Sequence, residues 1–102
     1  MMARRAAKVD RNQAELVAAF RAAGWSVQHL HGVGAGCPDL CVAGARAGVD
    51  VTALVEVKMP RGKLTPDQIA WRASWVGPAY IVRSVEDVCA LIEGRLEPWE
   101  ES

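Results

Sequence analysis

The sequence predicts one α/β domain, in which a small mixed sheet is flanked by helices and the elements follow the order α-β-β-β-α-β-α. The chain has 102 residues, of which 51% are hydrophobic and 24% charged, values typical of a single globular domain. Three segments carry apolar residues at helical spacing, each preceded by a residue that commonly caps a helix. Four short runs between them predict the strands.

The N-terminal part predicts the first helix and the first strand. Asp10 is expected to cap the helix, because Gln13 follows three residues later and completes a capping-box pattern. The apolar spacing continues to Gly24, which ends the helix. Residues 25–30 then alternate as in a strand, and the glycine-rich segment 32–36 predicts a loop.

The central part predicts a hairpin followed by the second helix. Residues 39–43 and 52–58 are two strands, and the segment GARAG between them, residues 44–48, has the composition of a turn. Thr65 caps the second helix, with a proline at the first helical position. The Gly-Pro pair at 77–78 stops this helix.

The C-terminal part predicts one more strand, residues 79–82, and a last helix capped by Ser84. The chain contains no repeats and no low-complexity stretch. We therefore divide it into three parts: a basic N-terminal arm (residues 1–9), the folded domain (residues 10–94) and an acidic C-terminal tail (residues 95–102).

Charge is unevenly distributed, although the formal net charge is zero. Residues 1–21 carry a net charge of +3, and residues 86–102 carry a net charge of −5. The overall charge does not indicate a polyanionic partner, so any surface that binds nucleic acid must be a local basic patch. The acidic end, EPWEES, is interpreted as a solvated tail, with Trp99 as the residue that can dock it onto the domain.

No segment predicts export or membrane insertion. The longest apolar run near the N-terminus, residues 16–20, is too short for a signal-peptide core or a membrane span. Three cysteines, an odd number, cannot form a complete disulfide framework, which is typical of a reducing compartment. The expected location is the cytoplasm.

An acidic and a basic side chain share one face of the strand predicted at residues 52–58. In the segment VEVK, Glu56 and Lys58 point to the same face, about 7 Å apart, whereas the two valines point into the core. Central strand positions normally hold apolar side chains, so this placement is unusual. Asp39 begins the preceding strand, and pairing of the two strands would set Asp39 beside Glu56.

Two adjacent carboxylates repel each other, and such a pair is stable mainly when a hard cation such as Mg²⁺ or Mn²⁺ lies between them. A lysine beside the pair can orient an attacking water or stabilise charge on a phosphate. Asp39, Glu56 and Lys58 therefore predict a metal-dependent site for phosphate chemistry at one end of the sheet.

These residues resemble the motif of a known nuclease superfamily. GCPDL followed by VEVK matches the PD-(D/E)xK pattern, with Asp39, Glu56 and Lys58 at its three reactive positions. The downstream segment KLTPDQIAW and the early Glu15 make the chain similar to the VRR-NUC (virus-type replication-repair nuclease) group over about residues 10–92. It resembles the small stand-alone members often found in phages and prophages, for which the location would be the host cytoplasm.

The resemblance implies a restriction-endonuclease-like core and metal-dependent hydrolysis of DNA phosphodiester bonds. It implies that Asp39, Glu56 and the backbone carbonyl of Val57 hold Mg²⁺ or Mn²⁺. Glu15 matches the helix-borne acidic residue that completes such sites and would be a further metal ligand. Lys58 would assist the nucleophilic water.

Gln68 matches the glutamine that the family carries on the following helix, and the resemblance implies that it lines the site. Stand-alone members are also similar to Holliday-junction resolvases and act as homodimers. By this analogy we expect branched DNA or junctions as the preferred substrate and a homodimer as the assembly.

Each of these residues also has a plain structural explanation. Glu56 and Lys58 can form an ion pair on a solvent-facing sheet, and Asp39 can be a turn residue. Glu15 near a helix N-terminus favours the helix dipole without any catalysis. Gln68 stands where a capping box places a glutamine. The combination of Asp39 with Glu56 and Lys58 favours the functional explanation for these three.

The segment HLHGVGAGCPDLC contains residue types that bind zinc in other proteins. Cys37 and Cys41 would lie about 13 Å apart in an extended strand, whereas two sulfurs on one zinc lie within about 4 Å of each other. Cys41 and Cys89 are instead expected to pack as small apolar residues. His29 and His31 share one face of the expected strand and point toward the site end, either as ordinary polar-face residues or as DNA contacts.

DNA contacts are predicted next to the site. The glycine-rich loop lacks the spacing of phosphate-binding and dinucleotide-binding loops. Its glycines either let the DNA backbone approach Asp39 closely or simply form a turn. Basic side chains after Lys58 and in the N-terminal arm are candidates for phosphate contacts. The predicted DNA-contacting residues are Arg61, Lys63, Gly34, Gly36, His31, Arg4, Arg5 and Lys8.

Two functions of other classes stay open. One is a DNA-binding or assembly module that has kept the fold without catalysis, and the other is a small zinc-binding interaction domain. Trp71 and Trp75, four residues apart on the second helix, are expected in the core or in a dimer interface rather than as platforms for base stacking.

Overall fold

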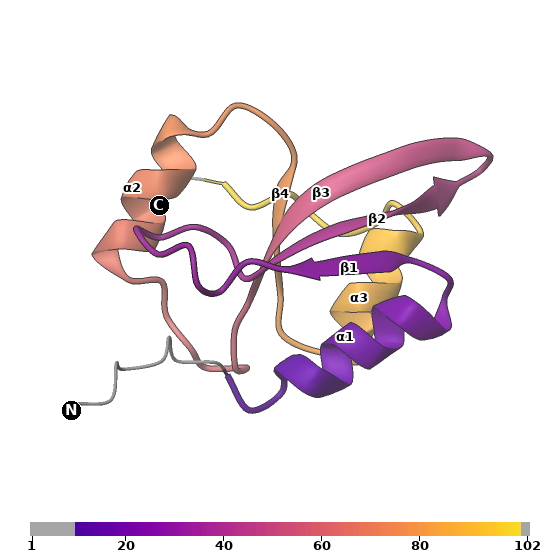
Figure 1. Cartoon of the computed structure of the whole chain (residues 1–102), viewed down its shortest axis with the longest axis horizontal. Coiled ribbons are helices and arrows are strands. Elements are labelled where there is room, and N and C mark those ends of the chain that lie inside the picture. Colours follow the sequence, from indigo (N-terminus) through magenta and orange to yellow (C-terminus); the bar gives the residue numbers. More distant parts are fainter. Residues whose placement is uncertain (1–9, 101–102) are drawn as a thin grey trace.

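Residues 10–100 are described by a computed structural model of the chain, and they form a four-stranded sheet with three helices (Figure 1). The predicted order α-β-β-β-α-β-α is confirmed. No helix within these residues is long and apolar enough to cross a membrane. The elements are α1 (Gln13–Ala22), β1 (Ser26–His29), β2 (Leu40–Arg46), β3 (Val49–Val57), α2 (Pro66–Ser74), β4 (Ala79–Val82) and α3 (Val85–Ile92).

The sheet is mixed and has the strand order β1-β2-β3-β4. The first three strands are antiparallel neighbours, and β4 pairs parallel to β3 after a crossover through α2. In the β2–β3 pair, Leu40 lies opposite Val55. This register places Asp39, the residue before β2, beside the last residues of β3. The acidic site is predicted at this end of the sheet.

The turn between β2 and β3 is tighter than the sequence predicts. The prediction that residues 44–48 form the turn is wrong, because β2 continues beyond Gly44 and only Ala47 and Gly48 connect the strands. Ala47 and Gly48 have φ angles of 51° and 79°, the positive values that a two-residue hairpin turn requires. Gly44 is needed for packing instead, since a Cβ there would lie 2.2 Å from the ring of Trp25.

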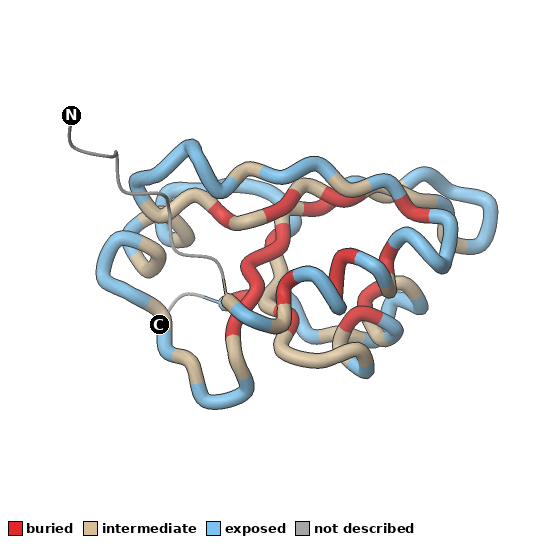
Figure 2. The backbone as a smooth tube through the Cα atoms, turned by 60° about the horizontal axis from the view of Figure 1, so that its bottom comes forward, coloured by how far each residue is buried: buried red, intermediate tan, exposed pale blue. Residues whose placement is uncertain are grey.

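The hydrophobic core lies between one face of the sheet and the helices α1 and α3, which lie side by side in Figure 1. Figure 2 shows buried positions along the strands and on the sides of these helices that face them. Burial of one Val, Leu or Phe side chain contributes about 1.5–3 kcal/mol, so this layer is a major source of stability. The core residues are Leu16, Val17, Phe20, Trp25, Leu40, Val42, Ala53, Val55, Val57, Val82, Val88 and Leu91.

Helix starts agree with the prediction at α2 and α3 and differ at α1. Thr65 and Gln68 form the reciprocal capping box of α2, and Ser84 caps α3 with its side chain. The prediction that Asp10 caps α1 is wrong, because the N-cap residue is Asn12, whose side chain makes no capping bond within residues 10–100. Asp10 therefore lies outside the helix, and its carboxylate is available for another contact.

The segment after α3 passes back beside β4 toward α2 (Figure 1). The backbone N–H of Trp99 donates to the carbonyl of Ala79 at 2.8 Å, and Trp99 is only 3% exposed. The ring of Trp99 stacks on Trp71 with 5.6 Å between centroids, and Trp71 stacks on Trp75 at 5.2 Å. Docking of the acidic end by Trp99 is thus confirmed, and Glu97 and Glu100 on either side of it are exposed to solvent.

All three cysteines, which lie within the described residues, are free thiols. Cys37 and Cys41 are partly buried, whereas Cys89 is exposed. The prediction that Cys89 packs as an apolar residue is therefore wrong, because the buried positions of α3 are those of Val88 and Leu91. The predicted basic arm, residues 1–9, lies outside the described residues, as do the last two residues of the predicted tail.

Candidate active site

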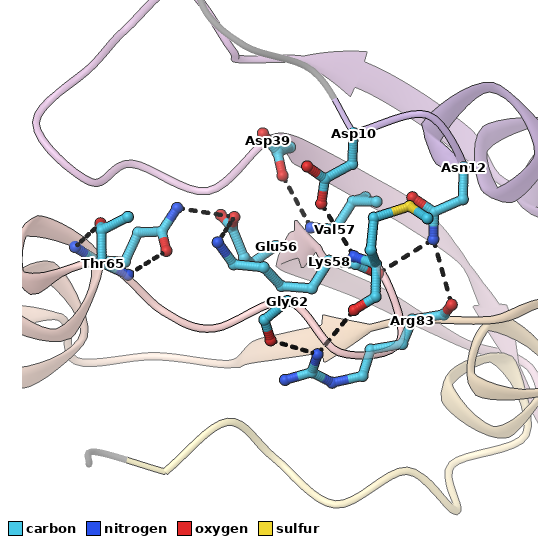
Figure 3. A network of polar contacts seen from close by, with 11 residues as sticks. Asp10, Asn12, Asp39, Glu56, Val57, Lys58, Gly62, Thr65 and Arg83 are labelled. Carbon is cyan, nitrogen blue, oxygen red and sulfur yellow. Dashed lines mark hydrogen bonds and ion pairs between the residues drawn. The ribbon is translucent and has the colours of Figure 1, made fainter.

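Asp39 lies immediately before β2 and beside the end of β3 (Figure 3). Its carboxylate Oδ2 accepts a hydrogen bond from the backbone N–H of Val57 at 2.8 Å. Its backbone carbonyl accepts from the N–H of Leu30 at 2.7 Å. The side chain is thus held at the strand end next to Glu56, the neighbour that the sequence predicts for it.

Glu56 lies in β3 and Lys58 directly follows this strand, and their charged groups are in contact. The Lys58 Nζ lies 3.6 Å from Glu56 Oε2, and the two residues are only 9% and 3% exposed. The other carboxylate oxygen, Glu56 Oε1, is buried and has no hydrogen-bond partner among residues 10–100. A buried carboxylate oxygen without a donor is costly, so this atom is a candidate ligand for a cation or for a bound water.

Gln68 unites the two roles that the sequence leaves open for it. Its side-chain Oε1 accepts from the backbone N–H of Thr65 at 2.9 Å, and the backbone N–H of Gln68 donates to Thr65 Oγ1 at 3.2 Å. The same side chain donates from Nε2 to Glu56 Oε2 at 3.0 Å. The capping box fixes the orientation of the amide, and the amide in turn fixes the orientation of the Glu56 carboxylate.

A further carboxylate reaches the site from the segment before α1. Asp10 Oδ2 accepts from the backbone N–H of Met59 at 3.1 Å, and Asp10 lines the same pocket as Asp39 and Glu56 (Figure 3). Glu15, which the resemblance implies as the helix-borne acid, is exposed on α1 and is not among the described residues that line the pocket. The only sequence signal for Asp10 is an acidic residue before a helix, which a capping role explains equally well.

These side chains surround a pocket of about 160 Å³ between the end of β3 and the start of α2. Its walls are polar and mostly acidic near β3, with the Lys58 ammonium as the basic group. Thr65 belongs to this wall although the sequence assigns it only a capping role. The lining residues are Asp10, Asp39, Glu56, Val57, Lys58, Thr65 and Gln68.

The environment of the pocket disfavours negative charge on its two central carboxylates. Burial raises the pKa of Glu56 to about 8, with a further contribution from the nearby Asp39, while Lys58 lowers the pKa in part. Burial also raises the pKa of Asp39, against the lowering effect of the hydrogen bond from Val57. The pair therefore tends to hold a proton at neutral pH, and a bound cation would favour its fully ionised form.

The donor atoms present fit a hard divalent cation. Asp39 and Glu56 offer carboxylate oxygens, of which the buried Glu56 Oε1 has no partner, and Val57 lines the same pocket. Among residues 10–100 no three His, Cys, Asp or Glu side chains form a ready-made metal cluster. Mg²⁺ is commonly bound by one or two carboxylates together with water and a substrate phosphate, so two carboxylates suffice for it. A zinc site built on Cys37 has less support. Zinc binds the thiolate form of cysteine, whereas burial and the nearby Glu56 and Asp39 raise the pKa of this thiol and so favour its neutral form.

The residues predicted to contact DNA near the site have different surroundings in the structure. Arg61 and Lys63 are exposed on the loop between β3 and α2. Gly34 is exposed, with φ 82° and open space around it. Gly36, with φ 81°, packs against the first turn of α2, where a Cβ would lie 2.2 Å from the carbonyl oxygen of Asp67. Close packing on α2 thus explains Gly36 without any approach of DNA.

The two histidines do not line the pocket. The prediction that they share a strand face is wrong, because β1 ends at His29 and His31 lies in the following loop. Both are exposed, and their rings meet edge to face at 6.0 Å. His29 Nδ1 lies 3.4 Å from the side-chain Nε2 of Gln13 on α1. The predicted contacts Arg4, Arg5 and Lys8 fall outside the described residues.

A mixed sheet presents two carboxylates and a lysine at one strand end, as is expected for a nuclease-type domain that processes DNA. The chain matches the family model of the VRR-NUC domain over residues 3–76, and it belongs to this family. The match includes every residue of the pocket and ends before β4. DNA is the partner that a nuclease domain implies. Neither the comparison with curated proteins nor the comparison with solved structures gave a match.

Proposed function

We propose that this protein is a divalent-metal-dependent DNA endonuclease of the PD-(D/E)xK type, which hydrolyses phosphodiester bonds. One observation carries the proposal. Asp39 and Glu56 line one pocket, burial raises the pKa of both carboxyl groups, and Lys58 Nζ lies 3.6 Å from Glu56 Oε2. A structural ion pair would need only one carboxylate, whereas two carboxylates with a free oxygen suit a cation that also binds a phosphate.

In the proposed mechanism, Asp39, Glu56 and the Val57 carbonyl would hold Mg²⁺ or Mn²⁺. When bound, the ion would polarise the phosphate and supply a more acidic water. Lys58 would orient the attacking water and neutralise charge that develops on the phosphate oxygens. Gln68 would keep the Glu56 carboxylate in one orientation through its 3.0 Å hydrogen bond.

Asp10 is the better candidate than Glu15 for a third acidic residue at this site. Asp10 lines the pocket and is oriented by the N–H of Met59, whereas Glu15 is exposed on α1. An additional carboxylate near the metal would bind its hydrating waters or a second ion. The N-terminal acidic function that the resemblance assigns to Glu15 would then be carried by Asp10.

The preferred substrate in this proposal is branched DNA, cut by a homodimer. The sheet face opposite α1 and α3 supports a dimer, because it carries an apolar hollow of about 340 Å³ lined in part by Leu54, Trp75 and Pro78. Trp75 is 42% exposed, and the next residue along the chain, Val76, is 97% exposed. A second copy on this face would cover these apolar groups and bring two sites into a symmetric pair.

The experiment that tests the proposal is cleavage of labelled four-way junction, splayed-arm and linear duplex DNA in Mg²⁺, Mn²⁺ or EDTA. The Lys58→Ala protein serves as the matched control. Symmetric cutting of the junction that needs metal and is lost in the variant would establish a dimeric resolvase-like nuclease. Cutting restricted to ends or flaps would keep the chemistry and discard the junction preference. Binding without cutting in either metal would replace the proposal with a non-catalytic DNA-binding module.

A further inference from the structure

One guanidinium group holds the loop that follows Lys58 (Figure 3). The loop makes a tight turn, in which the N–H of Gly62 donates to the carbonyl of Met59 at 2.8 Å. Arg83 Nη1 donates to that same Met59 carbonyl at 2.9 Å and to the carbonyl of Gly62 at 2.7 Å. It also lies 3.5 Å from the carbonyl of Pro60. Arg83 thus joins both ends of the turn.

Arg83 is itself well anchored by the elements around it. It follows β4 directly, and its backbone N–H donates to Asp87 Oδ2 of α3 at 2.9 Å. Its backbone carbonyl accepts from Asn12 Nδ2 at 3.2 Å. The side chain therefore extends from a fixed base, and hydrogen bonds from a charged donor to carbonyls are among the stronger ones in proteins.

Lys58 is held by contacts that do not involve the side chain of Arg83. The backbone N–H of Lys58 donates to the carbonyl of Val82 at 3.0 Å, and its carbonyl accepts from Asn12 Nδ2 at 3.1 Å. The next residue, Met59, is held by Asp10 through its N–H. Loss of the Arg83 side chain would thus release the loop while the lysine and its strand keep their positions.

The loop that Arg83 holds carries two exposed basic side chains, Arg61 and Lys63. We propose that Arg83 is a positioning residue for DNA affinity, because it orders residues 59–63 so that Arg61 and Lys63 are presented to the phosphates beside the pocket. An ordered loop loses less conformational entropy on binding than a free one. This inference rests on the proposed function, and it assigns Arg83 to binding rather than to the chemical step.

The first test needs no DNA. Trypsin cuts after Arg61 and after Lys63, and mass spectrometry can follow cleavage at these two bonds in the native protein. We expect Arg83→Met to accelerate these cuts about tenfold, because local opening exposes the loop. The matched control is Arg46→Met, since Arg46 likewise donates to two backbone carbonyls, those of Leu91 and Ile92, at the far end of the sheet. Equal cleavage rates in the two variants would overturn the anchoring role.

The second test measures DNA affinity as a function of salt in the Lys58→Ala background, which does not cut. Each phosphate contact contributes about 0.9 to the slope of log affinity against log salt. We therefore expect Arg83→Met to reduce the slope by up to about 2 and to weaken binding about tenfold at moderate salt. With Lys58 intact, kcat at saturating DNA should stay within about twofold. Arg83→Lys, which keeps a cationic donor, should recover part of the affinity, and Arg46→Met should leave the slope unchanged.

A double-mutant cycle decides how Arg83 acts. In a protein that carries Arg61→Gln and Lys63→Gln, the further change Arg83→Met should weaken DNA binding by less than about twofold. A full additional loss would mean that Arg83 contacts DNA directly, and it would overturn the positioning role. A tenfold fall in kcat would overturn it as well. If the unmodified protein binds no DNA, the proposed function fails together with the role in affinity, while trypsin still reports whether Arg83 anchors the loop.

Discussion

The side-chain amide of Gln68 donates to Glu56 at 3.0 Å while its oxygen accepts from the backbone of the helix cap, Thr65. One residue thereby connects the start of α2 to the central carboxylate of the site. The contact is possible because the capping box turns Gln68 back toward β3 instead of along the helix surface. A local helix signal thus contributes directly to the geometry of the candidate active site.

We expect Gln68→Met to lower kcat by about 10- to 100-fold, the usual effect of removing a hydrogen bond that orients a ligand. It should also cost about 1 kcal/mol of stability through the lost cap. Thr65→Ala should cost a similar stability and leave kcat much less affected, because the Gln68 amide still reaches Glu56. Urea unfolding and steady-state cleavage measure the two effects. Equal losses of kcat in both variants would mean that Gln68 acts only through the helix.

Asp39→Asn should reduce cleavage by at least about 10³-fold and leave the fold intact. The amide oxygen of the new side chain can still accept from the N–H of Val57, so the contact at 2.8 Å survives while the charge is lost. Circular dichroism and cleavage in Mg²⁺ and Mn²⁺ are the measurements. A variant that still cuts at the rate of the unmodified protein would show that Asp39 is a structural residue.

The two candidate N-terminal acids should behave differently. Asp10→Asn removes a charge from the wall of the pocket and should lower cleavage by about 100-fold. Glu15→Gln alters an exposed position on α1 and should change the rate by less than about twofold. Parallel cleavage assays of the two proteins decide between them. A larger loss in Glu15→Gln would restore the assignment that the sequence resemblance implies.

The stability of the metal-free protein should fall as pH rises from about 4.5 to about 8. In this window the folded state keeps a proton on Glu56, whose pKa burial raises to about 8, whereas the unfolded chain has released it. The folded state therefore binds more protons, and the free energy of unfolding decreases with pH until it levels off above the folded pKa. Asp39 contributes in the same direction, because its pKa is raised as well.

Urea unfolding in EDTA at several pH values measures this dependence, with Glu56→Gln as the control. The variant should show a flatter profile between the two limits, since it carries no titrating group at that position. Adding Mg²⁺ at pH 8 should stabilise the unmodified protein more than the variant, because binding to the folded state alone shifts the equilibrium. Identical profiles for the two proteins would refute a raised pKa at Glu56.

Val76→Glu should convert a dimer into a monomer without loss of the fold. Val76 is 97% exposed, so the change removes no contact within the chain, but it would place a charge in the proposed apolar interface. Sedimentation equilibrium gives the mass of both proteins. This face would be excluded as the interface if the unmodified protein is monomeric at high concentration. It would also be excluded if the Val76→Glu protein stays dimeric.

Much of the fold follows from short-range patterns. The order of elements, the caps at Thr65 and Ser84 and the common face of Glu56 and Lys58 depend on residues within a few positions of one another. Capping and strand alternation are local properties of the backbone, so they are visible in the sequence. The placement of Asp39 beside Glu56 needed only one added assumption, the pairing of two neighbouring strands.

Other features depend on contacts between distant segments, which no local pattern encodes. Asp10 enters the pocket because its carboxylate meets the N–H of Met59, 49 residues away, while the capping pattern around it predicts another role. A glycine is needed at position 36 because the backbone of α2 lies too close for a Cβ atom. Arg83 takes its position from the carbonyls of the turn after Lys58. The sequence by itself determined the elements and the central acidic pair with its lysine. The packing of the chain decided which further side chains reach that site, because a loop or terminal residue has no periodicity that directs it and takes its position from the partner it meets.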